Sequence, residues 1–283
     1  MANVLIKLKR FFTIDFYKYN FSRIFTIAEK NVKIQLRFKF NLIYSILNPF
    51  LPIIMSFFVL LRFFVVDVTF GPWDDTNYLV FLYTAFNIEL LRRVTKNFPN
   101  EILQEKYWKT LPALMIAPFN KLHLLFGIFL SNLIIIAIPF VVFFVLTYLI
   151  APISLISIIF IVFIFLLIDL IFSGISLFLA IFAISGENYW RVFSIGLQLV
   201  FYASCIIYPF EVFPPEAQSI IRLNPFYYIF DILRITWLEN NILFTITSNP
   251  FQFIILTGTA IIVPLIAIYV FNKVYDKFGI VGY

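Results

Sequence analysis

Long apolar stretches separated by short polar segments dominate this chain. Five of them have about the 20 residues that a helix needs to cross a hydrocarbon core of about 30 Å: 42–66, 122–150, 153–184, 192–208 and 251–271. A sixth stretch, 78–98, is apolar only as far as Leu91, because Arg92 and Arg93 follow. On length alone it fits a re-entrant or interfacial segment as well as a span, so its assignment depends on the charges.

The distribution of basic residues indicates that the sixth stretch is a membrane span. If 42–66 crosses outward, the next loop, 64–77, holds three Asp and no Lys or Arg. Segment 92–121 holds six Lys and Arg, so 78–98 returns the chain to the cytoplasm under the positive-inside rule. Of the 21 basic residues, 18 then lie inside, and the outer side keeps Arg62, Arg222 and Arg234. We predict an all-α membrane protein with six transmembrane helices and cytoplasmic N- and C-termini.

The composition agrees with a membrane protein. Of 283 residues, 62% are hydrophobic and 13% charged, with a mean hydropathy of +0.98, whereas soluble domains have about 25% charged residues. The single Cys205 has no intramolecular partner, which excludes a disulfide scaffold. The excess of basic residues on the cytoplasmic side of the bilayer accounts for the net charge of +6. We therefore expect a multi-pass protein of the cell membrane and no nucleic-acid partner.

Residues 1–41 are predicted to be a cytoplasmic interfacial segment. Its apolar residues recur at helical spacing, as in an amphipathic helix lying on a membrane: Phe21, Ile24, Phe25, Ala28 and Val32. Between residues 32 and 40, however, apolar and polar residues alternate as in a strand. We favour the helix, because an isolated strand beside a bilayer would leave backbone groups unpaired. Whether this segment is an anchor or a gate stays open.

A short cytoplasmic helix is predicted at about 100–112. Pro99 and Pro112 bracket residues of helix-forming composition, and Glu105 and Lys109 form a favourable i,i+4 pair. The helix presents a surface that either binds a partner protein or rests on lipid headgroups. Its residues are Tyr107, Trp108, Leu111 and Leu114.

The external segment 209–250 is too long for a plain hairpin and too polar for a span. Prolines divide it into two short helices, about 214–223 and 225–238, each with Pro near its first turn. We predict a re-entrant helical hairpin at about 209–238, before the last span. Such a hairpin must pack against neighbouring helices or line an exit, because irregular backbone in a bilayer needs cover.

Asp169 is the only acidic residue deep in a long apolar run. Placing it at mid-bilayer costs about 2.5–3.5 kcal/mol on insertion scales, so it is expected to face the protein interior. It is either a proton- or sodium-coupling carboxylate or a structural residue hydrogen-bonded to Ser173 or Asn132. We favour the structural role.

The chain carries no recognisable catalytic motif. His123 is the only histidine and has no Cys or carboxylate at ligand spacing, so no metal site is predicted. None of the eight glycines precedes Lys, which excludes a phosphate loop, and no nucleophile elbow is present. We therefore expect no enzyme activity and no cofactor bound by this chain itself, and an energy source in a partner or a gradient.

Two stretches match the motifs of a known family. YPFEVFPPEAQSIIRLNPFYYIFDILR (208–234) combines a proline-marked loop, a short helix, Asn224-Pro225, an aromatic run and a terminal Arg234. EILQEKYWKTLPALMIAPFNKLHLLFG (101–127) matches a coupling helix at Thr110, Leu111 and Ala117-Pro118, whereas Lys109 and Pro112 replace the usual Gly and Glu. With the order of the other segments, these stretches resemble the permease, the transmembrane subunit of an ABC exporter of the ABC-2 type.

This resemblance implies a partner and a reaction. Two permease subunits, as a homodimer or with a different permease, would form the pathway in contact with membrane lipid. Two cytosolic ATPase subunits would bind ATP and Mg and drive lipid-linked glycans, lipids or hydrophobic molecules outward. Residues 10–40 would be a lateral gate helix. The implied ATPase-coupling residues are Glu101, Glu105, Tyr107, Trp108, Thr110 and Leu111, and those of the hairpin are Pro214, Pro215, Asn224, Pro225, Asp231 and Arg234.

Two other functions remain as alternatives. A gradient-driven secondary transporter or channel would use Asp169, and a membrane-embedded enzyme or assembly factor would need a cluster of polar groups that the sequence lacks. In all three cases the expected organisation is an interfacial segment at 1–41, a six-helix transmembrane domain at 42–272 and a cytoplasmic tail at 273–283.

Overall fold

Helices make up nearly all of the described chain. The computed structural model describes residues 14–37, 39–48, 50–64, 70–74, 77–110 and 121–278. Within those ranges, the only β pairing is a single bridge between Phe70 and Trp73. The all-α class predicted from the sequence is therefore confirmed for this part of the protein.

Three helices of the described chain are long and apolar enough to cross a membrane. They are α8 (Lys121–Ile150), α9 (Leu155–Ser185) and α14 (Pro250–Phe278), and they match three of the predicted spans. The other three predicted spans fall on shorter helices and stay predictions: α3 (Lys39–Leu47) with α4 (Phe50–Phe64), α5 (Tyr78–Arg92) and α10 (Glu187–Tyr202). The predicted tail from residue 273 begins inside α14.

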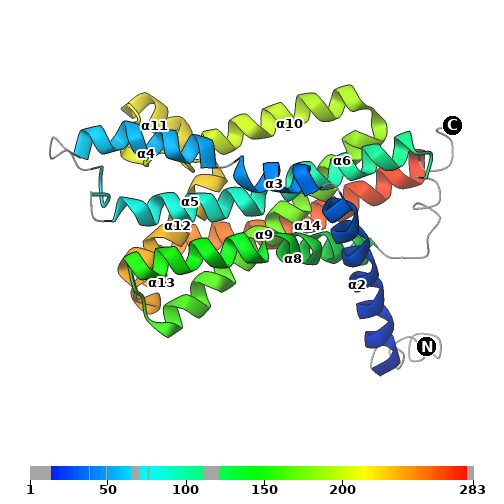
Figure 1. Cartoon of the computed structure of the whole chain (residues 1–283), viewed down its shortest axis with the longest axis horizontal. Coiled ribbons are helices and arrows are strands. Elements are labelled where there is room, and N and C mark those ends of the chain that lie inside the picture. The colour runs from blue at the N-terminus through cyan, green and yellow to red at the C-terminus, as the bar shows by residue number, and fades with distance from the viewer. Residues whose placement is uncertain are drawn as a thin grey trace.

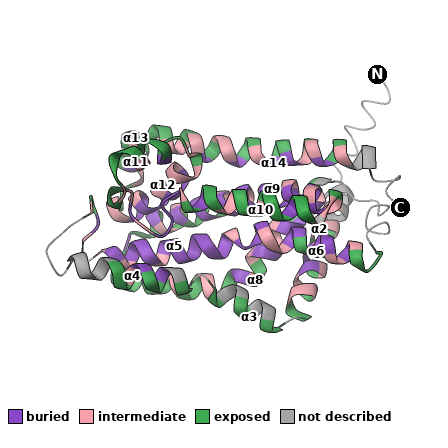
Figure 2. Ribbon diagram, turned by 90° about the horizontal axis from the view of Figure 1, so that it is seen from above, coloured by how far each residue is buried: buried purple, intermediate pink, exposed green. Residues whose placement is uncertain are grey.

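The core lies around α5 and α9, which are buried along much of their length (Figure 2). The N-terminus of α9 is capped by Ser154, whose hydroxyl accepts a hydrogen bond from the Ser157 amide. Further along α9, a Cβ on Gly174 would lie 3.0 Å from the backbone nitrogen of Pro264. The missing side chain thus allows α9 and α14 to pack closely.

Residues 1–13 of the predicted N-terminal segment lie outside the described residues. The described part begins with a helix, α2 (Ile14–Arg37), and the alternating pattern near the end of this helix is not a strand. The helix crosses α8 at Gly127, where an added Cβ would lie 2.5 Å from Cγ2 of Ile27. Asn20 and His123 hydrogen-bond across the same crossing at 3.0 Å. Apolar contact and this polar pair therefore hold α2 against α8.

The predicted cytoplasmic helix has different bounds in the structure. It is α6 (Val94–Tyr107), which begins directly after α5 and contains Pro99, so the break falls at Arg93 rather than at Pro99. Proline removes only one backbone donor here, while Phe98 and Ile102 on either side of it are buried and hold the helix in place. Lys109, in the left-handed conformation with φ 58°, follows the end of the helix.

The two helices predicted for the external segment are confirmed. They are α11 (Pro215–Ile221) and α12 (Pro225–Glu239), each with Pro at its start. A short 3-10 turn, η1 (Phe210–Val212), precedes them and α13 (Ile242–Ser248) follows. Figure 1 shows α11 and α13 at one end of the long axis and α2 and α6 at the other. The two segments that the sequence assigns to opposite membrane faces thus lie at opposite ends of the molecule.

Candidate functional site

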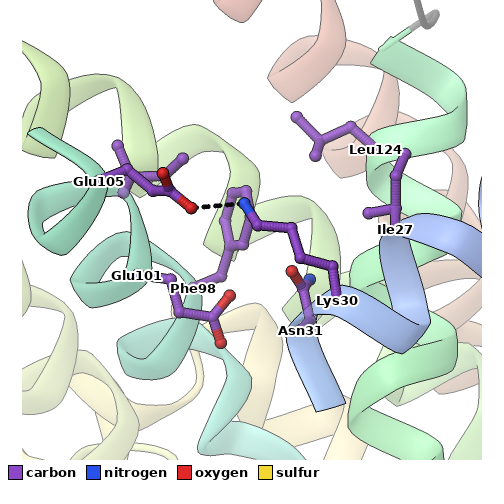
Figure 3. Close-up of a pocket in the computed structure, with 8 residues that line it drawn as sticks. Ile27, Lys30, Asn31, Phe98, Glu101, Glu105 and Leu124 are labelled. Atoms are coloured by element: carbon purple, nitrogen blue, oxygen red, sulfur yellow. Dashed lines mark ion pairs between the residues drawn. The ribbon is translucent and has the colours of Figure 1, made fainter. Parts of the chain in front are cut away.

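The first candidate site is the contact between α2 and α6, which we call the α2–α6 junction: Lys30, Asn31 and Gln35 of α2, with Arg93, Asn97, Glu101 and Glu105. The Lys30 ammonium lies 2.6 Å from Oε1 of Glu105 and reaches across from one helix to the other (Figure 3). Between the helices lies a cavity of about 20 Å³, room for about one water molecule. The junction therefore combines an ion pair with a small cavity whose lining is mostly apolar.

Gln35 is the centre of the hydrogen bonds in this junction. Its Nε2 donates to Oε1 of Glu101 at 3.0 Å. Its Oε1 accepts from Nη2 of Arg93 at 3.1 Å and from Nδ2 of Asn97 at 3.4 Å. One side chain of α2 thus bonds to the start and to the middle of α6.

The two glutamates of the junction have opposite pKa shifts. Burial raises the pKa of Glu101 to about 7, although the hydrogen bond from Gln35 and the charge of Lys30 act against it. Burial also raises the pKa of Glu105, but bonds from the Lys30 ammonium and the Thr110 hydroxyl outweigh it and leave the pKa below its usual value. Glu101 therefore titrates near neutral pH while Glu105 stays ionised.

The structure divides the residues predicted to dock an ATPase into two groups. Tyr107 and Trp108 are 65% and 50% exposed at the end of α6. Glu101 and Glu105 are only 8% exposed, because α2 covers them. Glu105 pairs with Lys30 rather than with the predicted Lys109.

The remaining residues of that prediction lie beyond α6. Thr110 is exposed, and its hydroxyl donates to the Glu105 carboxylate. Leu111 lies outside the described residues, as do Pro112 and the Ala117-Pro118 pair. Of the six predicted coupling residues, Tyr107, Trp108 and Thr110 are therefore described and exposed, whereas Glu101 and Glu105 are buried.

The second candidate site is the attachment of α12, where Arg234 is almost fully buried. Its Nη1 donates to the carbonyl of Cys205 at 2.9 Å and its Nη2 to the carbonyl of Ile206 at 2.7 Å. The guanidinium also lies 3.7 Å from the ring centroid of Phe81 on α5. We call these contacts the Arg234 clamp. They join α12 to α5 and to the turn that follows α10.

Asn224 attaches the start of α12 in a similar way. Its Oδ1 accepts from the amide of Phe226 as an N-cap. Its Nδ2 donates to the carbonyl of Val200 at 2.7 Å and to the hydroxyl of Ser204 at 2.8 Å. The Asn-Pro pair of the predicted motif thus begins the helix and also binds it to α10.

The other predicted hairpin residues lie at the starts of α11 and α12 or within α12. Pro214 is the residue before α11, Pro215 begins α11 and Pro225 begins α12. Burial raises the pKa of Asp231 to about 6, although the charge of Arg234 acts against it. These residues lie in α11 and α12 or directly before them.

Asp169 lies in the protein interior, as predicted, and is completely buried on α9. Of the two predicted partners, Asn132 donates from Nδ2 to Oδ1 of Asp169 at 2.5 Å. In the part of the protein that the structure describes, the Ser173 hydroxyl and Oδ2 of Asp169 find no hydrogen-bond partner. Among the described residues, no group of three His, Cys, Asp or Glu is placed to hold a metal ion.

Comparison with known proteins adds no family assignment: no protein-family model matches the chain, and no curated protein matches it. The described fold and sites define the class of protein as far as an all-α chain with three helices able to cross a membrane. A function must therefore be argued from the contacts of the junction, the clamp and the buried carboxylate.

Proposed function

We propose that this chain is the transmembrane permease subunit of an ATP-driven exporter of the ABC-2 type. The observation that supports the proposal best is the form of α6. Its end presents Tyr107 and Trp108 to solvent, while its body is bound to the surrounding helices. A helix exposed at its tip and attached along its length is suited to receive the movement of a partner protein and pass it on.

The attachments of α6 reach two other helices besides α2. Lys106 donates from Nζ to the carbonyl of Ile184, at the end of α9, at 3.0 Å. The indole of Trp190 on α10 donates to Oδ1 of Asn100 at 3.2 Å. The hydroxyl of Ser176 on α9 donates to the carbonyl of Val94. A displacement of α6 would therefore pull on α9 and α10 as well as on α2.

In this proposal the power comes from a separate subunit. Two cytosolic ATPase subunits bind ATP and Mg and dock on the exposed aromatic pair of two permease subunits in the cell membrane. The junction glutamates act inside the permease, since α2 covers them. The substrate is amphipathic: a lipid-linked glycan, a lipid or a hydrophobic molecule. Six spans and cytoplasmic termini belong to the same proposal, with the hairpin of α11 and α12 on the outer side.

Purification of the tagged full chain from the membranes of its own cells tests the proposal. We expect a phosphate-loop ATPase to copurify in mild detergent and to hydrolyse ATP in the complex. The double variant Tyr107→Ala with Trp108→Ala should lose the ATPase. The matched control is Phe251→Ala, which removes a side chain that is 57% exposed at the other end of the protein. Intact permease with no such ATPase, or equal recovery with both variants, would contradict the proposal.

The second candidate function is a gradient-driven carrier that uses Asp169. The observation in its favour is the unpartnered Oδ2 of a fully buried carboxylate. On this alternative, purified protein in vesicles transports without ATP, and Asp169→Asn abolishes that transport. If transport instead requires the copurified ATPase, the exporter is the correct function.

A further inference from the structure

The break between α5 and α6 has a tightened backbone. The amide of Arg93 bonds to the carbonyl of Leu90 at 3.3 Å, and the amide of Lys96 bonds to the carbonyl of Arg93 at 3.1 Å. Both bonds span three residues instead of the four of an α-helix. Such a tightened turn between two helical segments often marks a hinge.

Side chains bind the carbonyls on both sides of this break. Asn132 of α8 donates from Nδ2 to the carbonyl of Leu91 at 3.2 Å. The hydroxyl of Thr95 donates to the carbonyl of Arg92 at 2.8 Å, and the hydroxyl of Ser176 on α9 donates to the carbonyl of Val94 at 2.7 Å. Two neighbouring helices thus attach to the break through single hydrogen bonds.

Asp169 fixes the orientation of one of these donors. The Asn132 amide group has one nitrogen with two N–H bonds and one carbonyl oxygen. Nδ2 lies 2.5 Å from Oδ1 of Asp169 and 3.2 Å from the carbonyl of Leu91, so it serves both acceptors. With the amide turned over, its oxygen would face two acceptors and both bonds would be lost. The carboxylate therefore selects the orientation in which Asn132 can hold the break.

Packing alone does not account for this arrangement. Asp169 and Ser173 are fully buried, and in the described part of the chain Oδ2 of the carboxylate and the Ser173 hydroxyl have no hydrogen-bond partner. An unpartnered buried polar atom costs stability, and apolar residues of similar volume would pack here without that cost. What the carboxylate supplies that apolar residues cannot is the orientation of Asn132.

We propose that Asp169 is a positioning residue for the hinge between α5 and α6. Acting through Asn132, it holds the carbonyl of Leu91 so that α6 turns as a unit about Arg93 when a partner displaces it. The role in transport rests on the proposed function, whereas the effect on the hinge does not.

Hydrogen exchange of the full chain in lipid nanodiscs tests the hinge. Asp169→Asn keeps a side-chain oxygen that can accept from Asn132, so exchange of the backbone amides at 91–97 should stay within about two-fold of the parent protein. Asp169→Leu and Asn132→Ala remove the bond by two independent routes and should speed that exchange about ten-fold. Ser173→Ala is the control, since its hydroxyl has no partner to lose.

Two results would overturn the proposal. Fast exchange in Asp169→Asn equal to that in Asp169→Leu would show that the charge itself is needed and would overturn it. Unchanged exchange in both Asp169→Leu and Asn132→Ala would also overturn it. If Asp169→Leu does not fold, Asn132→Ala alone distinguishes these outcomes against the control.

ATP hydrolysis by the copurified complex tests the link to transport. Asp169→Leu should retain the ATPase and leave KM for ATP unchanged while kcat falls several-fold, and Asp169→Asn should restore kcat. An unchanged kcat in Asp169→Leu would overturn the role in coupling. Failure of the proposed function would be seen separately, as the absence of any copurifying ATPase, and the exchange result would still report on the hinge.

Discussion

Different kinds of contact stabilise the two ends of the molecule. At the α2–α6 junction, an ion pair joins two helices, and the side chain of one partner, Lys30, is 39% exposed. At the Arg234 clamp, a buried guanidinium donates to two backbone carbonyls. Water and salt can replace the first contact, whereas the second would leave buried polar groups unpaired if it opened. The comparison indicates that the junction is suited to movement and the clamp to a fixed structure.

The largest expected effect is at the clamp. Arg234→Leu removes two charge-assisted hydrogen bonds and leaves two buried carbonyls unpaired, so we expect a loss of about 3–5 kcal/mol in stability, measured by thermal unfolding in detergent. Arg222→Leu is the control, because Arg222 is exposed. Equal losses in the two variants would remove the distinction between clamp and surface.

The next effect is the pH dependence of the junction. The pKa of Glu101 is about 7 in the folded protein, above its ordinary value of 4.5. The folded chain therefore binds more protons than the unfolded chain between these values. The contribution of Glu101 to stability is greatest below pH 4.5 and is lost as pH rises through about 7, by about 3 kcal/mol in total.

Melting temperatures from pH 5.5 to 7.5 check this prediction. They should fall with rising pH, and Glu101→Gln should remove part of the slope. Asp231, whose pKa is raised to about 6, gives an effect of the same sign at the other end. Asp231→Asn should therefore leave the contribution of Glu101 in place. A slope that Glu101→Gln does not change would show that the junction does not titrate in this range.

A smaller effect is expected at Asn224. Asn224→Ala removes the cap of α12, the bond to Val200 of α10 and the bond to Ser204 just beyond α10, which should cost about 1–2 kcal/mol. The matched control, Asn241→Ala, removes a side chain that caps α13 on the exposed surface and should cost less than about 1 kcal/mol. If the two unfolding temperatures drop equally, the bonds to Val200 and Ser204 contribute nothing.

The smallest effect is expected for the ion pair of the junction. A double-mutant cycle with Lys30→Met and Glu105→Gln should give a coupling energy below about 1 kcal/mol, because Lys30 is partly exposed. The coupling should decrease further in high salt. A larger coupling that salt does not change would make the junction as fixed as the clamp.

Much of the fold could be predicted from patterns within single segments. The helical spacing of apolar residues in α2 and the prolines that begin α11 and α12 identified these helices. The position of the break at Arg93 could not be predicted in this way. The carbonyls beside it bind Asn132 and Ser176, which are distant in the sequence.

The candidate sites, too, could be predicted only where they depend on a single segment. An exposed aromatic pair near the end of a short helix could be predicted from composition, and Tyr107 and Trp108 are indeed exposed. Glu101 and Glu105 have the same local pattern as a solvent-facing acidic surface. They are buried because α2 covers them through Lys30 and Gln35. These two residues lie more than 60 positions earlier in the chain, so the local pattern could not reveal the burial.

The sequence by itself determined that the chain is helical and has segments apolar enough for a membrane, because these properties depend on residues close together along the chain. Only the tertiary structure decided which polar groups meet. It pairs Asp169 with Asn132 rather than with Ser173, places Arg234 against the carbonyls of Cys205 and Ile206, and covers the junction glutamates with α2. The physical reason is that a buried polar group must find a partner in space, wherever that partner lies in the sequence.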